Sequence, residues 1–150
     1  HGSFTGAVGE VTVDTDKDTV VVHDGSQAGG FAIPNLKTAQ EFTKTQNFNA
    51  TSLSDGSTIA WDASSNQVAK VTLGGNRTLA AATNQVDGAV YVLSVTQDGS
   101  GSRTLSFNSN YKFTGGTAPT LTTTASATDI LVFLSNGTNM QEIGRSLNVS

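Results

Sequence analysis

Apolar and polar side chains alternate through much of this chain, which is the pattern of β-strands that bury one face. Residues 10–14 alternate, and after a polar turn residues 20–22 form a β-branched run, so we expect a β-hairpin here. A single hairpin cannot bury its apolar faces in water. We therefore predict that residues 4–34 form a small β-prism-like oligomerisation module, with contacts made by Val11, Val13, Val20 and Val22.

A second series of strand patterns begins at residue 48. Residues 68–73 alternate, and residues 89–96 carry apolar side chains on both faces, which is typical of a central strand buried on both sides. Repeated strands separated by turn signals predict an antiparallel, jelly-roll-like β-sandwich over residues 48–150. Residues 35–47 follow a proline and are expected to be a linker or a short helix. The predicted fold class is all-β.

The composition narrows the possible classes of protein. Charged residues make up 13% of the chain, which suits a turn-rich β-protein and not a helical bundle. A net charge of −4 with eight scattered Lys and Arg gives no reason to expect nucleic acid as a partner. No apolar run approaches the roughly 18 residues that span a bilayer, so we expect no membrane insertion. Cysteine is absent, and residues 1–3 resemble an expression-tag remnant.

The hairpin also carries a recognisable motif. Residues 9–15 read Gly-Glu-x-x-Val-Asp-Thr, residues 18–25 read Asp-Thr-Val-x-Val-His-Asp-Gly, and residues 28–31 read Ala-Gly-Gly-Phe. This series resembles the small repeat of tail-fibre and tailspike proteins of tailed bacteriophages. Further segments of the second module resemble the same proteins: residues 71–79, 97–104, 111–121 and 129–139.

The resemblance implies a virion fibre or spike component that assembles as a homotrimer. It implies contacts with other virion fibre, tail or capsid proteins, and a place in the tail or head fibre of a particle made in a bacterial cytoplasm. It also implies attachment to a host cell-surface polysaccharide or protein through loops of the sandwich. Two alternatives remain open: a purely structural neck, adaptor or head-decorating module, and the non-catalytic part of a polysaccharide depolymerase.

Three alternating acidic residues at the hairpin turn superficially suggest a calcium loop: Asp14, Asp16 and Asp18. A calcium loop of this type also needs Gly at its sixth position and Glu at its twelfth, where this chain has Thr19 and Gly25. We therefore expect a solvated hairpin turn and no metal site.

Catalytic chemistry has little support in the sequence. His23 beside Asp24 could be half of an acid–base pair, but no activated nucleophile accompanies it, so a packed turn histidine is the expectation. A metal held by three copies of His23 is disfavoured because a His-x-His pair is missing. The glutamates at 10, 41 and 142 lie in unrelated segments, so no glycosidase carboxylate pair is indicated. We predict no enzyme activity and no cofactor.

Aromatic rings are the usual platforms for sugars. Tyr91 lies in the central strand and is expected in the core, and a packed position is also favoured for Trp61. Tyr111 and Phe113 lie in a Gly-rich loop, where exposure is expected. The candidate glycan- or receptor-binding residues are Tyr111, Phe113, Trp61 and, at the tight turn, Asn136.

Overall fold

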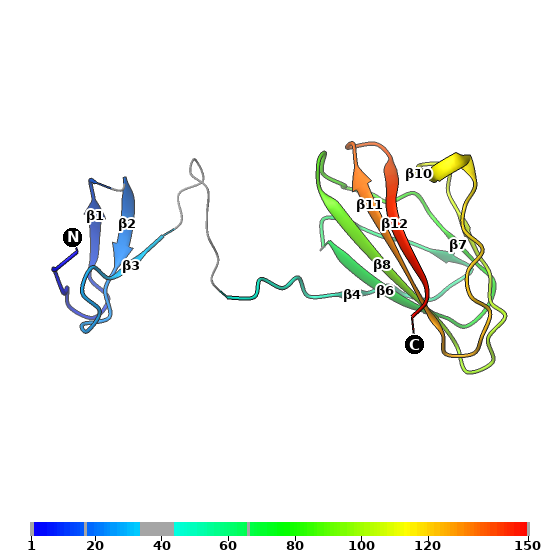
Figure 1. Ribbon diagram of the computed structural model, residues 1–150, viewed down its shortest axis with the longest axis horizontal. Helices are drawn as coiled ribbons and strands as arrows, with labels where there is room; N and C mark the ends of the chain where they lie inside the picture. Colours follow the sequence, from blue (N-terminus) through cyan, green and yellow to red (C-terminus); the bar gives the residue numbers. More distant parts are fainter. Residues whose placement is uncertain (1, 17, 34–43, 66, 150) are drawn as a thin grey trace. The chain divides into compact units, whose positions relative to one another are not determined.

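The computed structural model describes residues 2–16, 18–33, 44–65 and 67–149, and the chain divides into two units, residues 1–46 and 47–150 (Figure 1). Much of the linker or short helix predicted at 35–47 therefore lies outside the described residues. The N-terminal unit holds a three-stranded antiparallel sheet of β1 (Val11–Asp14), β2 (Thr19–Val22) and β3 (Phe31–Ala32). The predicted hairpin is confirmed, and β3 extends it.

The two faces of this small sheet differ in character. Val11 pairs with Val22 and Val13 with Val20, so the four valines share one face, which is exposed. The opposite face holds buried Val21 beside His23, which is 2% exposed. The unit thus has an interior of its own on one side of the sheet and an uncovered apolar surface on the other.

His23 anchors the interior of the N-terminal unit. Its Nδ1 accepts the backbone N–H of Gly6 at 3.2 Å, and its Nε2 lies 2.9 Å from the hydroxyl of Thr12. The ring of Phe4 meets the imidazole edge to face at 5.3 Å. Because Nδ1 accepts, we assign the ring proton to Nε2, which donates to Thr12. These contacts make His23 a packed structural histidine, as the sequence indicated.

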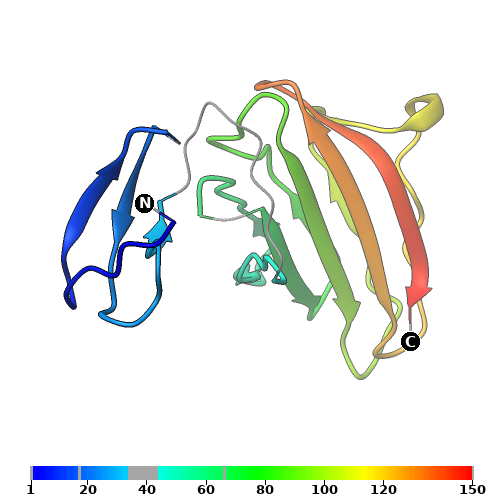
Figure 2. The same ribbon diagram turned by 60° about the vertical axis from the view of Figure 1, so that its left-hand side comes forward.

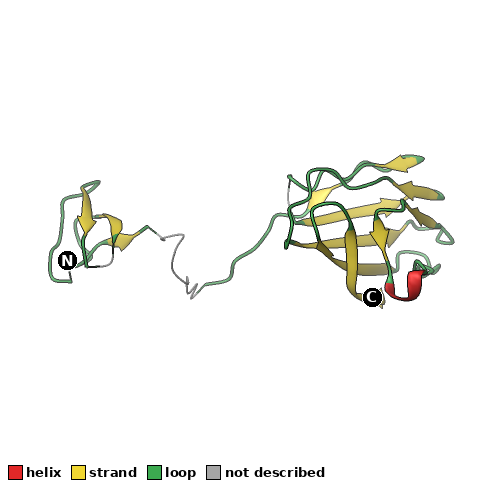
Figure 3. Cartoon of the chain, turned by 90° about the horizontal axis from the view of Figure 1, so that it is seen from above, coloured by secondary structure: helices red, strands yellow, loops and turns green. Residues whose placement is uncertain are grey.

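The C-terminal unit contains two sheets within its described residues (Figures 2 and 3). The larger has the spatial order β10-β12-β11-β8-β6-β4 and consists of β4 (Thr51–Ser52), β6 (Val68–Leu73), β8 (Val90–Gln97), β10 (Tyr111–Lys112), β11 (Thr128–Ser135) and β12 (Met140–Val149). The smaller has the order β5-β7-β9 and consists of β5 (Thr58–Ile59), β7 (Arg77–Leu79) and β9 (Leu105–Phe107). A single helical turn, η1 (Thr114–Gly116), follows β10 in this described part.

The chain alternates between the two sheets from β4 to β9. Strands β4, β6 and β8 lie in the large sheet and pair in parallel, while β5, β7 and β9 form the small sheet and also pair in parallel. Strand β11 pairs antiparallel with both β8 and β12, and β10 runs parallel to β12. The predicted all-β class is confirmed, but the strand directions differ from an antiparallel jelly roll, because this segment winds in successive coils and not in hairpins.

The core of the C-terminal unit lies between its sheets. Trp61 packs edge to face on Tyr91 with ring centroids 5.9 Å apart, and both are buried with Leu93 and Phe133. Strand β8 is central, as predicted, but only one of its faces is buried. Its other face is half-exposed, which contradicts the expectation of burial on both sides. That uncovered face carries the candidate site.

Candidate functional site

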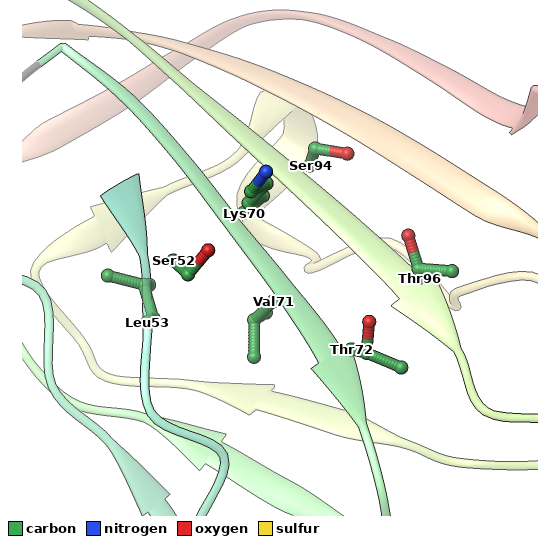
Figure 4. A pocket seen from close by; sticks show the side chains of 7 residues that line it. All are labelled: Ser52, Leu53, Lys70, Val71, Thr72, Ser94 and Thr96. Carbon is green, nitrogen blue, oxygen red and sulfur yellow. The ribbon is translucent and has the colours of Figure 1, made fainter. Parts of the chain in front are cut away.

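A groove lies on the uncovered face of the large sheet, where β4, β6 and β8 run side by side (Figure 4). Its volume is about 360 Å³. Because side chains alternate between faces, the odd-numbered side chains of β6 and β8 enter the core, that of the groove-bordering Val71 included, and the even-numbered ones face the groove side of the sheet. The lining residues are Ser52, Leu53, Lys70, Val71, Thr72, Ser94 and Thr96.

The strand register arranges the polar side chains in two rows. Ser52, Lys70 and Ser94 are successive partners across β4, β6 and β8. Thr72 and Thr96 are partners in the next row along the same strands. Partners in a ladder point to the same face, and neighbouring strands lie about 4.8 Å apart, so the first row extends about 10 Å. The result is one ammonium group surrounded by hydroxyls.

Most of these groups have hydrogen-bonding capacity to spare. Within the described residues, the side chains of Ser52, Thr72 and Ser94 make no hydrogen bond. The Lys70 ammonium likewise has no hydrogen bond or ion pair in that part of the chain. Thr96 differs, because its hydroxyl lies 2.9 Å from that of Thr128. Three hydroxyls and one cation are therefore available to an external ligand.

Two arginine–aspartate pairs flank the ends of the groove strands. Arg77 donates to both oxygens of Asp55, at 2.7 and 2.6 Å, and this bonding holds the pKa of that carboxyl below its usual range. Arg103 donates twice to Asp98, at 3.0 and 2.8 Å, and lowers its pKa in the same way. Both carboxylates therefore already have cationic partners.

The aromatic candidates predicted from sequence are not brought together as a surface. Trp61 is 1% exposed and Tyr111 is 4% exposed. Tyr111 lies in β10 and not in an open loop, with its ring 5.4 Å from that of Phe133 and 5.8 Å from that of Phe107. This burial raises the pKa of its hydroxyl. The expectation that Tyr111 is exposed is therefore wrong, because its ring completes an aromatic cluster.

The other two candidates have structural contacts. Phe113 is partly buried against the same cluster, with its ring 4.9 Å from that of Phe107. Asn136 is exposed at the turn before β12, where its Oδ1 accepts the backbone N–H groups of Thr138 at 3.1 Å and Asn139 at 2.7 Å. Asn136 thus closes the turn.

The described residues offer neither a metal-binding cluster nor a membrane-spanning helix. Among the described residues there is no group of three or more His, Cys, Asp or Glu side chains that could hold a metal ion. At the hairpin turn, the carboxylate of Asp14 accepts the backbone N–H of Asp16 at 3.1 Å. No helix in the described ranges has the length and apolar character needed to cross a membrane.

Sequence reasoning missed the groove, although part of its signal is visible in the chain. Polar residues alternate with apolar ones in β6 and over residues 93–96 of β8, which predicts a solvent-facing row on each of these segments. The parallel pairing that aligns Lys70 with Ser94 and Ser52 has no local signature. The solvent-facing polar residues of each strand could have been identified from the sequence, but not the alignment of one strand with the next.

Comparison with known proteins gives two matches to families. Residues 36–140 match the phage tail fibre C-terminal domain, and residues 1–27 match the major tropism determinant N-terminal domain. The chain is also similar to the tail fibre receptor-binding protein of Bordetella phage BPP-1, with 49% identity over 61 residues. That alignment covers 33% of this chain and 16% of the length of the phage protein.

Proposed function

The chain belongs to the phage tail fibre C-terminal domain family, and we propose on that basis that it attaches a bacteriophage-type virion to its host cell. The observation that carries the proposal is the similarity to a tail fibre receptor-binding protein. The ligand is a cell-surface polysaccharide or protein, held without covalent chemistry. We place the contact surface at the groove around Lys70 and not at the sandwich loops, because the hydroxyls of Ser52, Thr72 and Ser94 make no hydrogen bond within the described residues.

The N-terminal unit supports an oligomeric fibre. Its four exposed valines form an apolar face on one side of the small sheet, and no other described part of the N-terminal unit buries that face. We propose that three copies bury this face around a common axis, through Val11, Val13, Val20 and Val22. A homotrimer presents three C-terminal units to a repetitive cell surface, which raises avidity without any new contact. Other fibre, tail or capsid proteins of the virion are the further partners.

We also infer that the chain is not an enzyme. The Glu10 carboxylate accepts the backbone N–H of Ala7 at 2.8 Å, and Glu142 pairs with Arg145 at 2.6 Å. These two glutamates lie in different units, and Glu41 lies outside the described residues. A glycosidase needs two carboxylates about 5–10 Å apart across one cleft. The arrangement supports binding without catalysis, including the case of a non-catalytic depolymerase segment.

A structural neck, adaptor or head-decorating module is the second candidate. It is favoured by the small share of the Bordetella phage protein that the chain matches, 16%, because receptor contact in that protein could lie elsewhere. In this case the chain would bind other virion proteins and leave host cells untouched.

Adsorption to cells tests attachment directly. Fluorescently labelled full chain is incubated with intact cells of strains that the virion infects and of strains that resist its adsorption. We expect saturable binding to the susceptible strains and competition with virion adsorption. Binding to neither set of strains would overturn the attachment function, and co-sedimentation with virion proteins in that case would establish the structural module.

A further inference from the structure

We propose that the groove around Lys70 binds a carboxylate-bearing saccharide, with the ammonium contacting the carboxylate and the hydroxyls of Ser52, Thr72 and Ser94 contacting sugar hydroxyls. The inference rests on the proposed attachment function and names the chemical class of its ligand. It follows from the charge, the hydroxyl pattern and the rigidity of this face.

Charge is the first argument. The chain carries a net charge of −4, yet the groove contains one ammonium without a carboxylate partner in the described residues. The neighbouring arginines, Arg77 and Arg103, are already paired with aspartates. A single cation on an acidic chain matches a ligand with isolated negative charges. A nucleic acid, with a charge at every phosphate, would need several cations and would be repelled by the rest of the chain.

The hydroxyls supply the second argument. A serine or threonine hydroxyl both donates and accepts, which matches the vicinal hydroxyl groups of a sugar ring. The row from Ser52 through Lys70 to Ser94 extends about 10 Å, and Thr72 lies about 7 Å further along β6. This area fits one or two sugar rings, and the groove volume of about 360 Å³ lies within the range of small-ligand sites.

Rigidity is the third argument. Lys70, Thr72, Ser94 and Thr96 project from β6 and β8, which pair in parallel over six residues and hold the buried core on their opposite face. The backbone that carries these side chains is already fixed in the sheet, so little backbone freedom is lost when a ligand binds, and weak polar contacts can add up. Figure 4 shows Lys70 flanked by Ser52 and Ser94 on the neighbouring strands.

Saccharide titration of the full chain followed by nuclear magnetic resonance tests the proposal. The probes are trigalacturonate and a disialic acid as carboxylate-bearing saccharides, with maltotriose as the neutral control. We expect at least one acidic probe to shift the amide signals of β4, β6 and β8, while maltotriose binds about fivefold or more weakly, since exposed charge contacts are worth about 1 kcal/mol. Rising salt should weaken the acidic probe's binding.

Two charge-matched variants locate the contact. Lys70→Gln removes the ammonium from the groove, and Lys112→Gln removes one from β10, where its Nζ donates to the carbonyl of Ser109 at 2.6 Å. We expect Lys70→Gln to weaken the acidic probe about fivefold or more and Lys112→Gln to leave binding unchanged. Ser94→Ala, which keeps the charge, should weaken it by a smaller factor.

The outcomes separate this inference from the attachment function. If neither acidic probe shifts the groove amides, or if the two lysine variants behave alike, the inference is wrong. If the chain binds susceptible cells in that case, the attachment function stands without it. If an acidic probe binds through Lys70 but the chain adsorbs to no cell, the groove chemistry stands and the attachment function fails.

Discussion

The valine face of the N-terminal unit gives the sharpest quantitative prediction. Val11 and Val13 are 61% and 62% exposed, and Val20 and Val22 are each 37% exposed. Together these fractions correspond to about two fully exposed valines in each protomer. Burying a valine side chain completely is worth about 1.5–3 kcal/mol, so covering this face would contribute about 3–6 kcal/mol per protomer before the costs of association.

The perturbation is the double substitution Val11→Thr and Val13→Thr. Threonine keeps the shape and strand preference of valine but places a hydroxyl in the proposed interface. We take the cost as about 1 kcal/mol per site, which gives about 6 kcal/mol over the six sites of a trimer. Since two association steps share this cost, the concentration of half-dissociation should rise on the order of a hundredfold.

Sedimentation velocity over a concentration series measures the effect. We expect the natural sequence to sediment at about three times the monomer mass of 15.4 kDa, and the variant to dissociate at micromolar concentrations. The matched control is Val86→Thr with Val90→Thr, in the C-terminal unit, where the exposed fractions are 63% and 41%. Natural chain that sediments as a monomer at all concentrations, or equal effects of the two double substitutions, would refute the reasoning.

Three further predictions concern the C-terminal unit. Gly101→Ala should lower the melting temperature well below that of Gly88→Ala. Both glycines have positive φ, but of these two positions only 101 would bring the new Cβ against backbone atoms, the nearest at 2.5 Å. Equal losses of melting temperature would contradict this packing. Tyr111→Phe should be neutral or stabilising in denaturant unfolding, since its buried hydroxyl has no hydrogen-bond partner among the described residues. Tyr91→Phe should cost about 1 kcal/mol in the same assay, because it loses the 3.0 Å hydrogen bond that the Tyr91 hydroxyl accepts from the backbone N–H of Val86. The arginine partner lowers the pKa of Asp55, so the stabilisation from this pair is complete above the ordinary pKa of 3.8 and is lost as the pH falls through the lowered pKa of the folded state. The difference in melting temperature between the natural chain and Asp55→Asn should therefore shrink at low pH. A difference that stays constant with pH would count against a stabilising pair.

The sequence predicted those parts of the fold whose signals are local. Alternation over residues 10–14 and the valine run at 20–22 specify the hairpin, because the side-chain period and the turn residues act within a few positions. Apolar side chains on both faces of residues 89–96 correctly identified β8 as a central strand. The same pattern misjudged the outer face of β8, since half-exposed Val92 looks the same in sequence as a buried valine. Whether a second layer covers a face depends on the number of sheets and not on the strand itself.

The aromatic residues show a different limit. A Gly-rich segment around Tyr111 suggested an exposed loop, and Gly115 and Gly116 do adopt positive φ at a turn. The ring of Tyr111 nevertheless packs against Phe133, because β10 adds to the edge of the large sheet beside β12. The energy of burying the Tyr111 ring exceeds the local turn preference, even though its hydroxyl has no hydrogen-bond partner in the described part of the chain. Loop composition therefore says little about aromatic exposure when a nearby sheet edge is available.

The groove itself follows from the strand directions that the sequence did not predict. Had β7 paired with β6 as its antiparallel neighbour, as the predicted antiparallel sandwich would allow, β6 and β8 would not lie side by side, and Lys70 would not have the hydroxyl of Ser94 beside it. The chain instead crosses to the small sheet through β7 and returns as β8 in parallel with β6. Each coil then adds one polar position to the same row on the outer face while its apolar positions fill the core. Coiled winding thus accounts both for the closed interior and for the polar surface proposed to bind the host, and a substitution that shifted the register of β6 by one residue would destroy both together.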